Sequence, residues 1–348
     1  MSEPRGIPEV RGLPREALTA WAADHVPGLG ADWHAEVVSG GLSNLTYLVH
    51  GAERTVVVRR PPVGKLLPSA HDMGREQRVM SALWDTPVPV PQVLAWCADP
   101  EVLGAPFYVM AEVDGVVYRE PEQVTRDLGE DERDALCDRL VQALAAIHQV
   151  DLGATGLRDF GRPSGYLERQ VRRWSGQWEA RRTRDLPDMD ELVSRLEAQR
   201  PPEGELTLVH GDYRLDNTLV SRREGTPEVA AVVDWELSTL GDPLADLATW
   251  LTYWTGRDAD GHPLIVGAGV PTLPGFPSAD ELAGRYAAVT GRDVSGLAYY
   301  RAFADFRLAV IAEGVHARYV AGIASGEGYD RAAGAVPLMV ERALTHLS

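Results

Sequence analysis

The 348-residue chain is predicted to adopt an α+β fold with two lobes, a β-rich N-terminal lobe and a mostly helical C-terminal lobe. Between residues 33 and 113, short apolar or alternating runs are typical of strands, and one helical segment interrupts them. After Gly115 the apolar residues recur at helical spacing, and only short strands break the pattern. This change of periodicity favours two lobes with a cleft between them.

In the N-terminal half we expect strands at 35–38, 46–49, 55–58 and 107–110, with a helix at 73–83 between the last two. An earlier helix at 13–26 ends at Pro27-Gly28. Residues 1–12 are expected to be flexible, which predicts an N-lobe at 13–112 and a C-lobe at 113–348. The helices expected in the C-lobe cover residues 131–150, 166–182, 189–199, 244–254, 279–290, 297–324 and 332–347.

The composition is that of an ordinary globular protein with an acidic balance. Asp and Glu number 51 against 34 Lys and Arg, a net charge of −17. This charge disfavours nucleic acid and membrane surfaces as partners. The chain has no apolar run of about 18 residues, and its N-terminus lacks the apolar core of a signal peptide, so we expect a cytoplasmic protein. Cys97 and Cys137 are expected to be buried free thiols.

The most informative stretch is residues 206–235. An apolar run ending at Val209 leads into a polar loop, His210-Gly211-Asp212-Tyr213-Arg214-Leu215-Asp216-Asn217, and a hairpin then ends at Asp234. Closing the hairpin predicts that Asp212, Asn217 and Asp234 converge. Phosphoryl transfer needs such a set, with one carboxylate for the attacking hydroxyl and further oxygens for Mg²⁺.

This pattern resembles the aminoglycoside phosphotransferase and choline kinase-like family of the protein-kinase fold. The loop reads H-G-D-x-x-x-x-N, and Asp234-Trp235-Glu236 stands where protein kinases have D-F-G. The resemblance implies ATP as donor, Asp212 as catalytic base or orienting group, and Asn217 and Asp234 as Mg²⁺ ligands. A plainer interpretation, in which these side chains only cap turns, explains each residue but not the combination.

The resemblance also implies a nucleotide site in the N-lobe. The small turn around Gly40, Gly41, Ser43 and Asn44 lies between two predicted strands and suits close approach of backbone N–H groups to phosphates. The alternative is a simple hairpin. Residues 107–115 resemble the family's hinge, with Met110 beside the adenine and backbone groups of Ala111 and Val113 pairing with its edge.

The phosphate-binding cation is expected on the strand at 55–58 and its continuation. Arg59 occupies the aligned position, where protein kinases have Lys, and Glu76 on the following helix is the expected carboxylate partner. A guanidinium can bind phosphate and pair with a carboxylate. Arg60 and Lys65 are rival candidates, and a surface arginine at a strand end is the plain alternative.

Other polar residues near the motif are expected to support it. His210 should tie the loop to the core, and His148 should lie in the core. Asp242 and Asp246 look like cap and loop-supporting carboxylates at a helix start. Asp216 is expected to shape the turn, and Arg214 is left open between a phosphate and an acidic neighbour.

The segments 59–71, 75–76, 161–171 and 235–243 resemble more specifically the kinase-like domains associated with acyl-CoA dehydrogenases. This resemblance implies a hydroxyacyl-CoA acceptor. Independently, seven arginines between Arg162 and Arg184 alternate with Trp174 and Trp178, a pattern that suits phosphates and an adenine ring or a solvated helix face. The expected function is an ATP-dependent small-molecule kinase. An aminoglycoside or amino-alcohol kinase, and a catalytically silent nucleotide-binding regulator, are the alternatives. The sequence leaves open whether the protein is a monomer or a homodimer.

Overall fold

The computed structural model describes residues 10–38, 44–63, 72–162, 164–256, 264, 270–322 and 332–348. The chain divides into two compact units. The first comprises residues 1–114 and 230–236, and the second comprises residues 115–229 and 237–348. The first unit therefore includes a segment from the middle of the chain, which a single linear boundary at residue 113 assigns to the other lobe.

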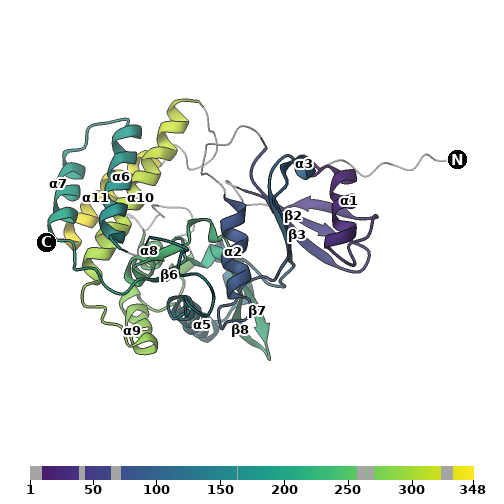
Figure 1. Cartoon of the computed structure of the whole chain (residues 1–348). Helices are drawn as coiled ribbons and strands as arrows, with labels where there is room; N and C mark the ends of the chain where they lie inside the picture. The colour runs from purple at the N-terminus through teal and green to yellow at the C-terminus, as the bar shows by residue number, and fades with distance from the viewer. Residues whose placement is uncertain are drawn as a thin grey trace. The chain divides into compact units, whose positions relative to one another are not determined.

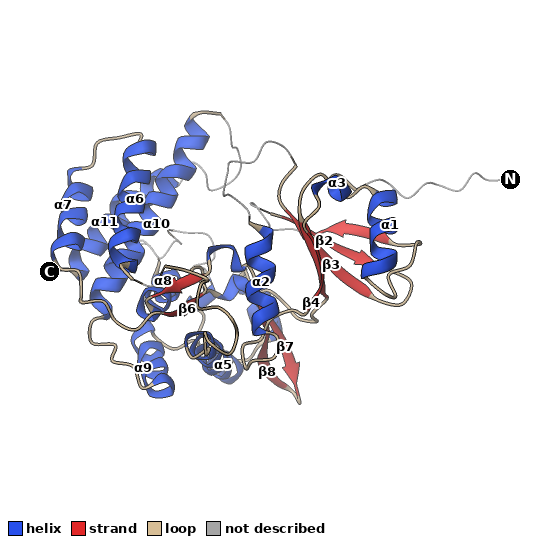
Figure 2. Ribbon diagram, viewed as in Figure 1, coloured by secondary structure: helices blue, strands red, loops and turns tan. Residues whose placement is uncertain are grey.

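The first unit is built on an antiparallel sheet of five strands in the order β1-β2-β3-β5-β4. Helix α1 lies on one side of this sheet and helix α2 on the other (Figure 2). The elements are β1 His34–Val37, β2 Leu45–His50, β3 Thr55–Arg60, β4 Val93–Cys97, β5 Phe107–Ala111, α1 Arg15–His25, α2 Met73–Leu83 and α3 Pro100–Leu103.

Alternation along β3 assigns its side chains to the two faces of the sheet. Val56 and Val58 are fully buried in a core with Leu18 and Ala22 of α1. Because successive strand residues point to opposite faces, Arg60 shares the face of these valines and Arg59 points to the other face. The same alternation therefore separates two arginines that are neighbours in the sequence.

The second unit is mostly helical. Helix α10 packs against α6, α8 and α11, so it is the central helix of this unit (Figure 1). The helices are α4 Pro121–Asp127, α5 Glu130–His148, α6 Tyr166–Arg181, α7 Pro187–Ala198, α8 Pro243–Thr255, α9 Ala279–Thr290, α10 Leu297–Val320 and α11 Ala332–His346.

Two small sheets interrupt the helices. Strand β6 (Thr207–Val209) pairs with β9 (Thr239–Gly241) in antiparallel register, and β7 (Thr218–Arg223) pairs with β8 (Thr226–Val232). The predicted catalytic loop leaves β6 and enters β7 through a 3₁₀ turn at Leu215–Asn217. Both ends of the loop are therefore fixed by β pairing.

The predicted fold class is confirmed. The expected helix at 73–83 matches α2 in both bounds, whereas β4, α3 and α4 were not predicted. Cys97 and Cys137 are buried free thiols, as predicted. In the part of the chain that the structure describes, no helix combines the length and the apolar character needed to cross a membrane.

Candidate active site

A buried carboxylate from helix α8 holds the start of the catalytic loop. Oδ2 of Asp246 accepts the backbone N–H of His210 at 2.7 Å, and Oδ1 accepts that of Gly211 at 2.8 Å. His148, at the end of α5, lies 3.2 Å from Oδ2 through Nε2, and its Nδ1 lies 2.7 Å from the Tyr286 hydroxyl. The predicted loop-supporting role of Asp246 and the core position of His148 are confirmed.

This network keeps the Asp246 carboxylate ionised. Burial alone would raise the pKa of Asp246, but the hydrogen bond from His148, interaction with His148 and His210, and the backbone N–H of His210 lower the pKa overall. A carboxylate that accepts several N–H groups is stabilised in its charged form. The loop is thus attached to α8 by charge-assisted hydrogen bonds.

Gly211 permits the tight turn before Asp212. Its φ is +85°, and an added Cβ would lie 2.6 Å from the carbonyl oxygen of Leu237. A residue with a side chain is therefore strained there both by backbone conformation and by space. The Gly211 carbonyl accepts a 2.6 Å hydrogen bond from Nη2 of Arg307 on α10. Helices α8 and α10 thus hold both sides of one peptide segment.

Asp212 lies between two donors. Nδ2 of Asn217 donates to Oδ2 of Asp212 at 3.0 Å and to the Asp212 carbonyl at 2.8 Å, and the Tyr253 hydroxyl lies 3.3 Å from Oδ1. Burial and the negative charge of Asp212 raise the pKa of Tyr253, so the hydroxyl stays protonated and donates. The Asp212 side chain keeps a fifth of its surface exposed, so it remains accessible.

Arg214 completes this group of side chains. Its guanidinium lies 3.5 Å from Oδ2 of Asp212 and 3.4 Å from Oδ2 of Asp216. It also lies over the ring of Tyr253, 4.7 Å from the ring centroid. Arg214 therefore pairs with acidic neighbours, one of the two roles that the sequence left open.

The first unit brings three predicted residues together. Nε of Arg59 lies 3.1 Å from Oε2 of Glu76, and Nη2 lies 2.6 Å from Oδ1 of Asp234. Burial alone would lower the pKa of Arg59, but attraction to Glu76, with further contributions that include Asp234, raises it above its usual range. The guanidinium is therefore a permanent cation, and the predicted pairing with Glu76 is present.

Arg60, the rival of Arg59, is engaged elsewhere. Its guanidinium donates to the carbonyl oxygens of Gly12 at 2.6 Å, Leu103 at 2.7 Å and Pro61 at 3.1 Å, and the residue is 4% exposed. These bonds join the end of β3 to the segments around α1 and α3. Arg60 is thus a structural arginine, and Lys65 lies outside the described residues.

Asp234 has an unusual backbone. Its φ is 67°, in the left-handed region that a residue with a side chain rarely adopts. Trp235 is fully buried, and its indole donates to the Val232 carbonyl at 2.9 Å. Oε2 of Glu236 accepts from Nδ2 of Asn44 at 3.1 Å. An observed outlier of this kind is typical of functional positions.

The remaining predicted nucleotide contacts are only partly described. Gly40, Gly41 and Ser43 lie outside the described residues. Met110 is buried in β5, Ala111 ends that strand, and the backbone N–H of Ala111 donates to the Gln92 carbonyl at 2.8 Å. Val113 follows the strand. Their role toward adenine stays a prediction.

Helix α6 carries part of the arginine-rich segment. Arg172 pairs with Glu168 at 3.6 Å and Arg182 with Glu179 at 3.4 Å. Both ion pairs are exposed and contribute little to the stability of the protein. The Trp174 ring lies 5.4 Å from the guanidinium of Arg173 and 5.5 Å from that of Arg307. Through Trp174 and Arg307, α6 is thus connected to the catalytic loop within the second unit.

Sequence reasoning missed two residues beside Asp212. Tyr253 is on α8 and Arg307 on α10, each far along the chain from the loop. Both lie within predicted helices, where an aromatic or basic residue gives no sign of its partner. Spacing along α8 was the one available signal, since Tyr253 follows Asp246 by seven residues, about two helical turns, and so shares its face.

The donor chemistry fits a hard divalent cation. With Nδ2 of Asn217 donating to Asp212, the amide oxygen Oδ1 is left as the ligand atom, and Asp234 supplies carboxylate oxygens. No group of three or more His, Cys, Asp or Glu residues suited to a metal occurs among the described residues, so the protein ligands would need other oxygens to complete the coordination. Asn217 and Asp234 belong to different units, and their convergence stays a prediction.

Curated relatives share this chain's sequence over most of its length. It is 40% identical over 289 residues to "Acyl-CoA dehydrogenase family member 10" of Mus musculus, which covers 82% of this chain and 26% of that protein. It is 38% identical over 313 residues to "Acyl-CoA dehydrogenase family member 11" of Gallus gallus, which covers 88% and 39% respectively. The chain thus spans well under half the length of these relatives.

Solved structures share its fold. A Ralstonia eutropha protein provisionally named an aminoglycoside phosphotransferase is 34% identical, with a TM-score of 0.80 over 96% of this chain and 98% of that one. A thermostable mutant of APH(4)-Ia, in complex with AMP-PNP and hygromycin B, has a TM-score of 0.61 at 18% identity, over 96% and 97% of the two chains.

The family model described as "Phosphotransferase enzyme family" matches residues 34–282. That match includes β1, the catalytic loop, Asp234 and the first turn of α9. Together with the relatives, it supports a phosphotransferase that acts on small molecules. The chain belongs to the phosphotransferase enzyme family, with a kinase-like fold.

Proposed function

We propose that this protein is an ATP-dependent kinase that transfers the γ-phosphoryl group to a hydroxyl of a small molecule. The observation that carries the proposal is the setting of Asp212, whose carboxylate is held by Asn217 and Tyr253 in a loop anchored to Asp246. A carboxylate fixed in this way can orient an acceptor hydroxyl and take its proton as the phosphoryl group is transferred.

The other roles follow from charge and chemistry. Arg59 supplies a permanent positive charge for the nucleotide phosphates, with Glu76 holding its guanidinium. Asn217 and Asp234 supply oxygens for Mg²⁺, which when bound neutralises phosphate charge. Gly40, Gly41, Ser43 and Asn44 are assigned to the phosphates by the sequence pattern alone.

For the acceptor we propose an anionic molecule of the hydroxyacyl-CoA class. Arg214, Arg307 and Arg173 are all connected to the region of Asp212 through direct contacts or through the rings of Tyr253 and Trp174. Guanidinium groups attract phosphates and repel polycations. The names of the relatives, which refer to acyl-CoA dehydrogenases, support the same class.

An aminoglycoside or amino-alcohol acceptor is the second candidate. It is favoured by the names of the structural neighbours, one of which is a complex with hygromycin B. A polycationic acceptor needs carboxylates beside Asp212, and Asp216 and Asp212 are both paired with Arg214. The arginines of this region therefore favour the anionic class.

A turnover panel tests the proposal. Production of ADP from ATP is measured with hydroxyacyl-CoA thioesters, amino alcohols and aminoglycosides, and the phosphorylated product is identified by mass spectrometry. We expect transfer to a hydroxyacyl-CoA. Transfer only to an aminoglycoside or amino alcohol would support the kinase activity and overturn the proposed hydroxyacyl-CoA acceptor. Transfer to no compound of the panel would overturn the proposed range of acceptors.

A charge-reversed variant sharpens the acceptor test. The double substitution Arg172→Glu and Arg173→Glu should raise the KM for the acyl-CoA and leave the KM for ATP unchanged, with a smaller effect in high salt because exposed charges are screened. Arg139→Glu with Arg195→Glu, also on helix surfaces, is the matched control. If the KM for the acyl-CoA is the same in the two double variants, the α6 arginines form a solvated helix face and do not bind the acceptor.

A further inference from the structure

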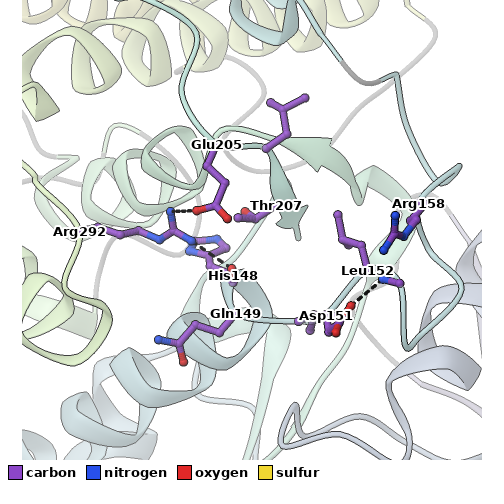
Figure 3. A pocket seen from close by; sticks show the side chains of 11 residues that line it. His148, Gln149, Asp151, Leu152, Arg158, Glu205, Thr207 and Arg292 are labelled. Carbon is purple, nitrogen blue, oxygen red and sulfur yellow. Dashed lines mark hydrogen bonds and ion pairs between the residues drawn. The ribbon is translucent and has the colours of Figure 1, made fainter.

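A cavity of about 510 Å³ opens in the second unit and shares no residue with the catalytic loop. Its walls are the end of α5 with the turn that follows, the residues that enter β6, and the segment after α9 (Figure 3). Cavities of this size hold small metabolites. The polar residues of its lining include His148, Asp151, Arg158, Glu205, Thr207 and Arg292.

Three charged side chains in the wall already have partners. Arg292 donates through Nη1 to Oε2 of Glu205 at 3.0 Å and through Nη2 to the His148 carbonyl at 3.2 Å. Oδ1 of Asp151 accepts the backbone N–H groups of Gly153 at 2.7 Å and Ala154 at 3.0 Å. These interactions fix the shape of this part of the cavity wall.

Two other lining groups make no hydrogen bond or ion pair among the described residues, although the Arg158 charge attracts that of Asp151. Thr207 is 5% exposed, and its hydroxyl is buried without a hydrogen bond. The guanidinium of Arg158 makes neither a hydrogen bond nor an ion pair within the described ranges, and it lies against the backbone of Gly153, where an added Cβ would be 2.6 Å from Nη2. Arg158 is exposed, whereas the Thr207 hydroxyl is buried, and a buried polar group without a partner is costly unless a ligand or water satisfies it.

We propose that this cavity binds a small metabolite with one anionic group, a phosphate ester or a carboxylate, together with a hydroxyl. The anionic group would pair with Arg158, and the hydroxyl would exchange a hydrogen bond with Thr207. Asp151 and Glu205 balance the charges of Arg158 and Arg292, so the wall as a whole favours a compact ligand over a polyanion such as a nucleotide.

The position of the cavity couples its occupant to the catalytic loop. Thr207 begins β6, which ends directly before His210. His148, another lining residue, contacts Asp246, the carboxylate that holds the N–H groups of His210 and Gly211. A ligand that orders these two attachments should make the loop open less often.

Three probes of similar size test the binding. The ¹⁵N-labelled protein is titrated with glycerol 3-phosphate, glycerate and glycerol, and the backbone amide signals of Gly153 and Thr207 are followed by NMR. We expect saturable shifts with at least one of the two anions, and the anion that binds identifies the group. Glycerol, which has the hydroxyls without the charge, should give none. Failure of both anions to bind would overturn the proposal.

Variants assign the binding to the cavity. Arg158→Gln should weaken the affinity for the anion about tenfold, which corresponds to about 1.4 kcal/mol. Thr207→Val, which keeps the side-chain shape, should weaken it by a smaller factor. Arg139→Gln, on the exposed side of α5, is the matched control and should bind as the unmodified protein does. Undiminished affinity in both Arg158→Gln and Thr207→Val would overturn the site.

Gly153→Ala gives an independent check, because its methyl group displaces the Arg158 guanidinium without removing any charge. It should weaken binding as Arg158→Gln does. Hydrogen exchange at the amides of His210 and Gly211 should slow when the site is saturated. Exchange that stays unchanged at saturation would overturn the coupling to the loop. None of these measurements depends on the proposed kinase activity, since they need neither nucleotide nor acceptor.

Discussion

Nη2 of Arg59 lies 2.6 Å from Oδ1 of Asp234, although the two residues are 175 positions apart in the sequence. Both belong to the first unit, because the segment 230–236 is part of that unit. Arg59 therefore contacts two carboxylates, Glu76 on α2 and Asp234 after β8. In the proposed kinase, a nucleotide phosphate would compete for the Arg59 guanidinium and Mg²⁺ for the Asp234 carboxylate. Substitutions at Arg59 and Asp234 should therefore change nucleotide binding.

Replacing Arg59 tests the assignment of the phosphate-binding cation. Arg59→Gln alone would leave the Glu76 carboxylate buried and unpaired, so the change is combined with Glu76→Gln. We expect the Kd for ATP to rise about tenfold or more, because a charge-assisted hydrogen bond is lost, and the Kd for adenosine to stay unchanged. Glu76→Gln alone, with Arg59 intact, is the control. An equal loss of affinity for ATP and for adenosine would instead assign Arg59 a structural role.

Asp212→Asn tests the catalytic assignment. The amide keeps the size of the side chain but cannot take a proton, so we expect kcat to fall roughly 100- to 10,000-fold. Nucleotide affinity, measured by equilibrium titration, should persist. Asp188→Asn, at an exposed position of α7, is the matched control and should leave both quantities unchanged. Near-normal turnover in Asp212→Asn would contradict the catalytic role of Asp212.

Asp234→Asn tests the metal assignment without disturbing the backbone. Asn tolerates the left-handed conformation at φ of 67°, so the variant removes the negative charge and keeps the backbone conformation. ATP affinity should decrease more with Mg²⁺ present than without it. Glu224→Asn, at the other described non-glycine residue with positive φ, controls for backbone effects. Equal losses with and without Mg²⁺ would contradict the ligand role.

Asp246→Asn tests how the catalytic loop is held. The amide cannot accept the N–H groups of His210 and Gly211 as the carboxylate does, so we expect the free energy of unfolding at pH 7 to fall by about 2–4 kcal/mol. Urea unfolding gives the value. Asp293→Asn, at an exposed carboxylate that caps a turn, is the control and should cost much less.

The same variant carries a pH prediction. The folded-state pKa of Asp246 is lowered, so its contribution to stability is complete above the unfolded value of about 3.9 and is lost as the pH falls through the folded pKa. The difference in unfolding free energy between the unmodified protein and Asp246→Asn should therefore stay constant from pH 7 to about pH 5 and narrow below about pH 4. A difference that grows with acid would contradict the sign of the shift.

The sequence by itself determined the features that depend on local order. The alternation of apolar residues in β3, the helical spacing of α2 and the order of residues from His210 to Asn217 are properties of short segments. They predicted the fold class and the loop, and the resemblance to kinases carried by these segments implied the pairing of Arg59 with Glu76. The loop-supporting role of Asp246 was predicted for the same reason, since it sits one turn into a helix that a capping residue begins.

Only the tertiary structure decided which distant groups meet. It decided that Arg59 meets the carboxylates of Glu76 and Asp234, whereas Arg60 donates to the carbonyls of Gly12 and Leu103. It placed Tyr253 and Arg307 beside the catalytic loop, and it formed a cavity from segments near residues 150, 206 and 292. Side-chain contacts between remote segments depend on how helices and sheets pack. The sequence around a polar helix residue therefore does not identify the residue that it contacts.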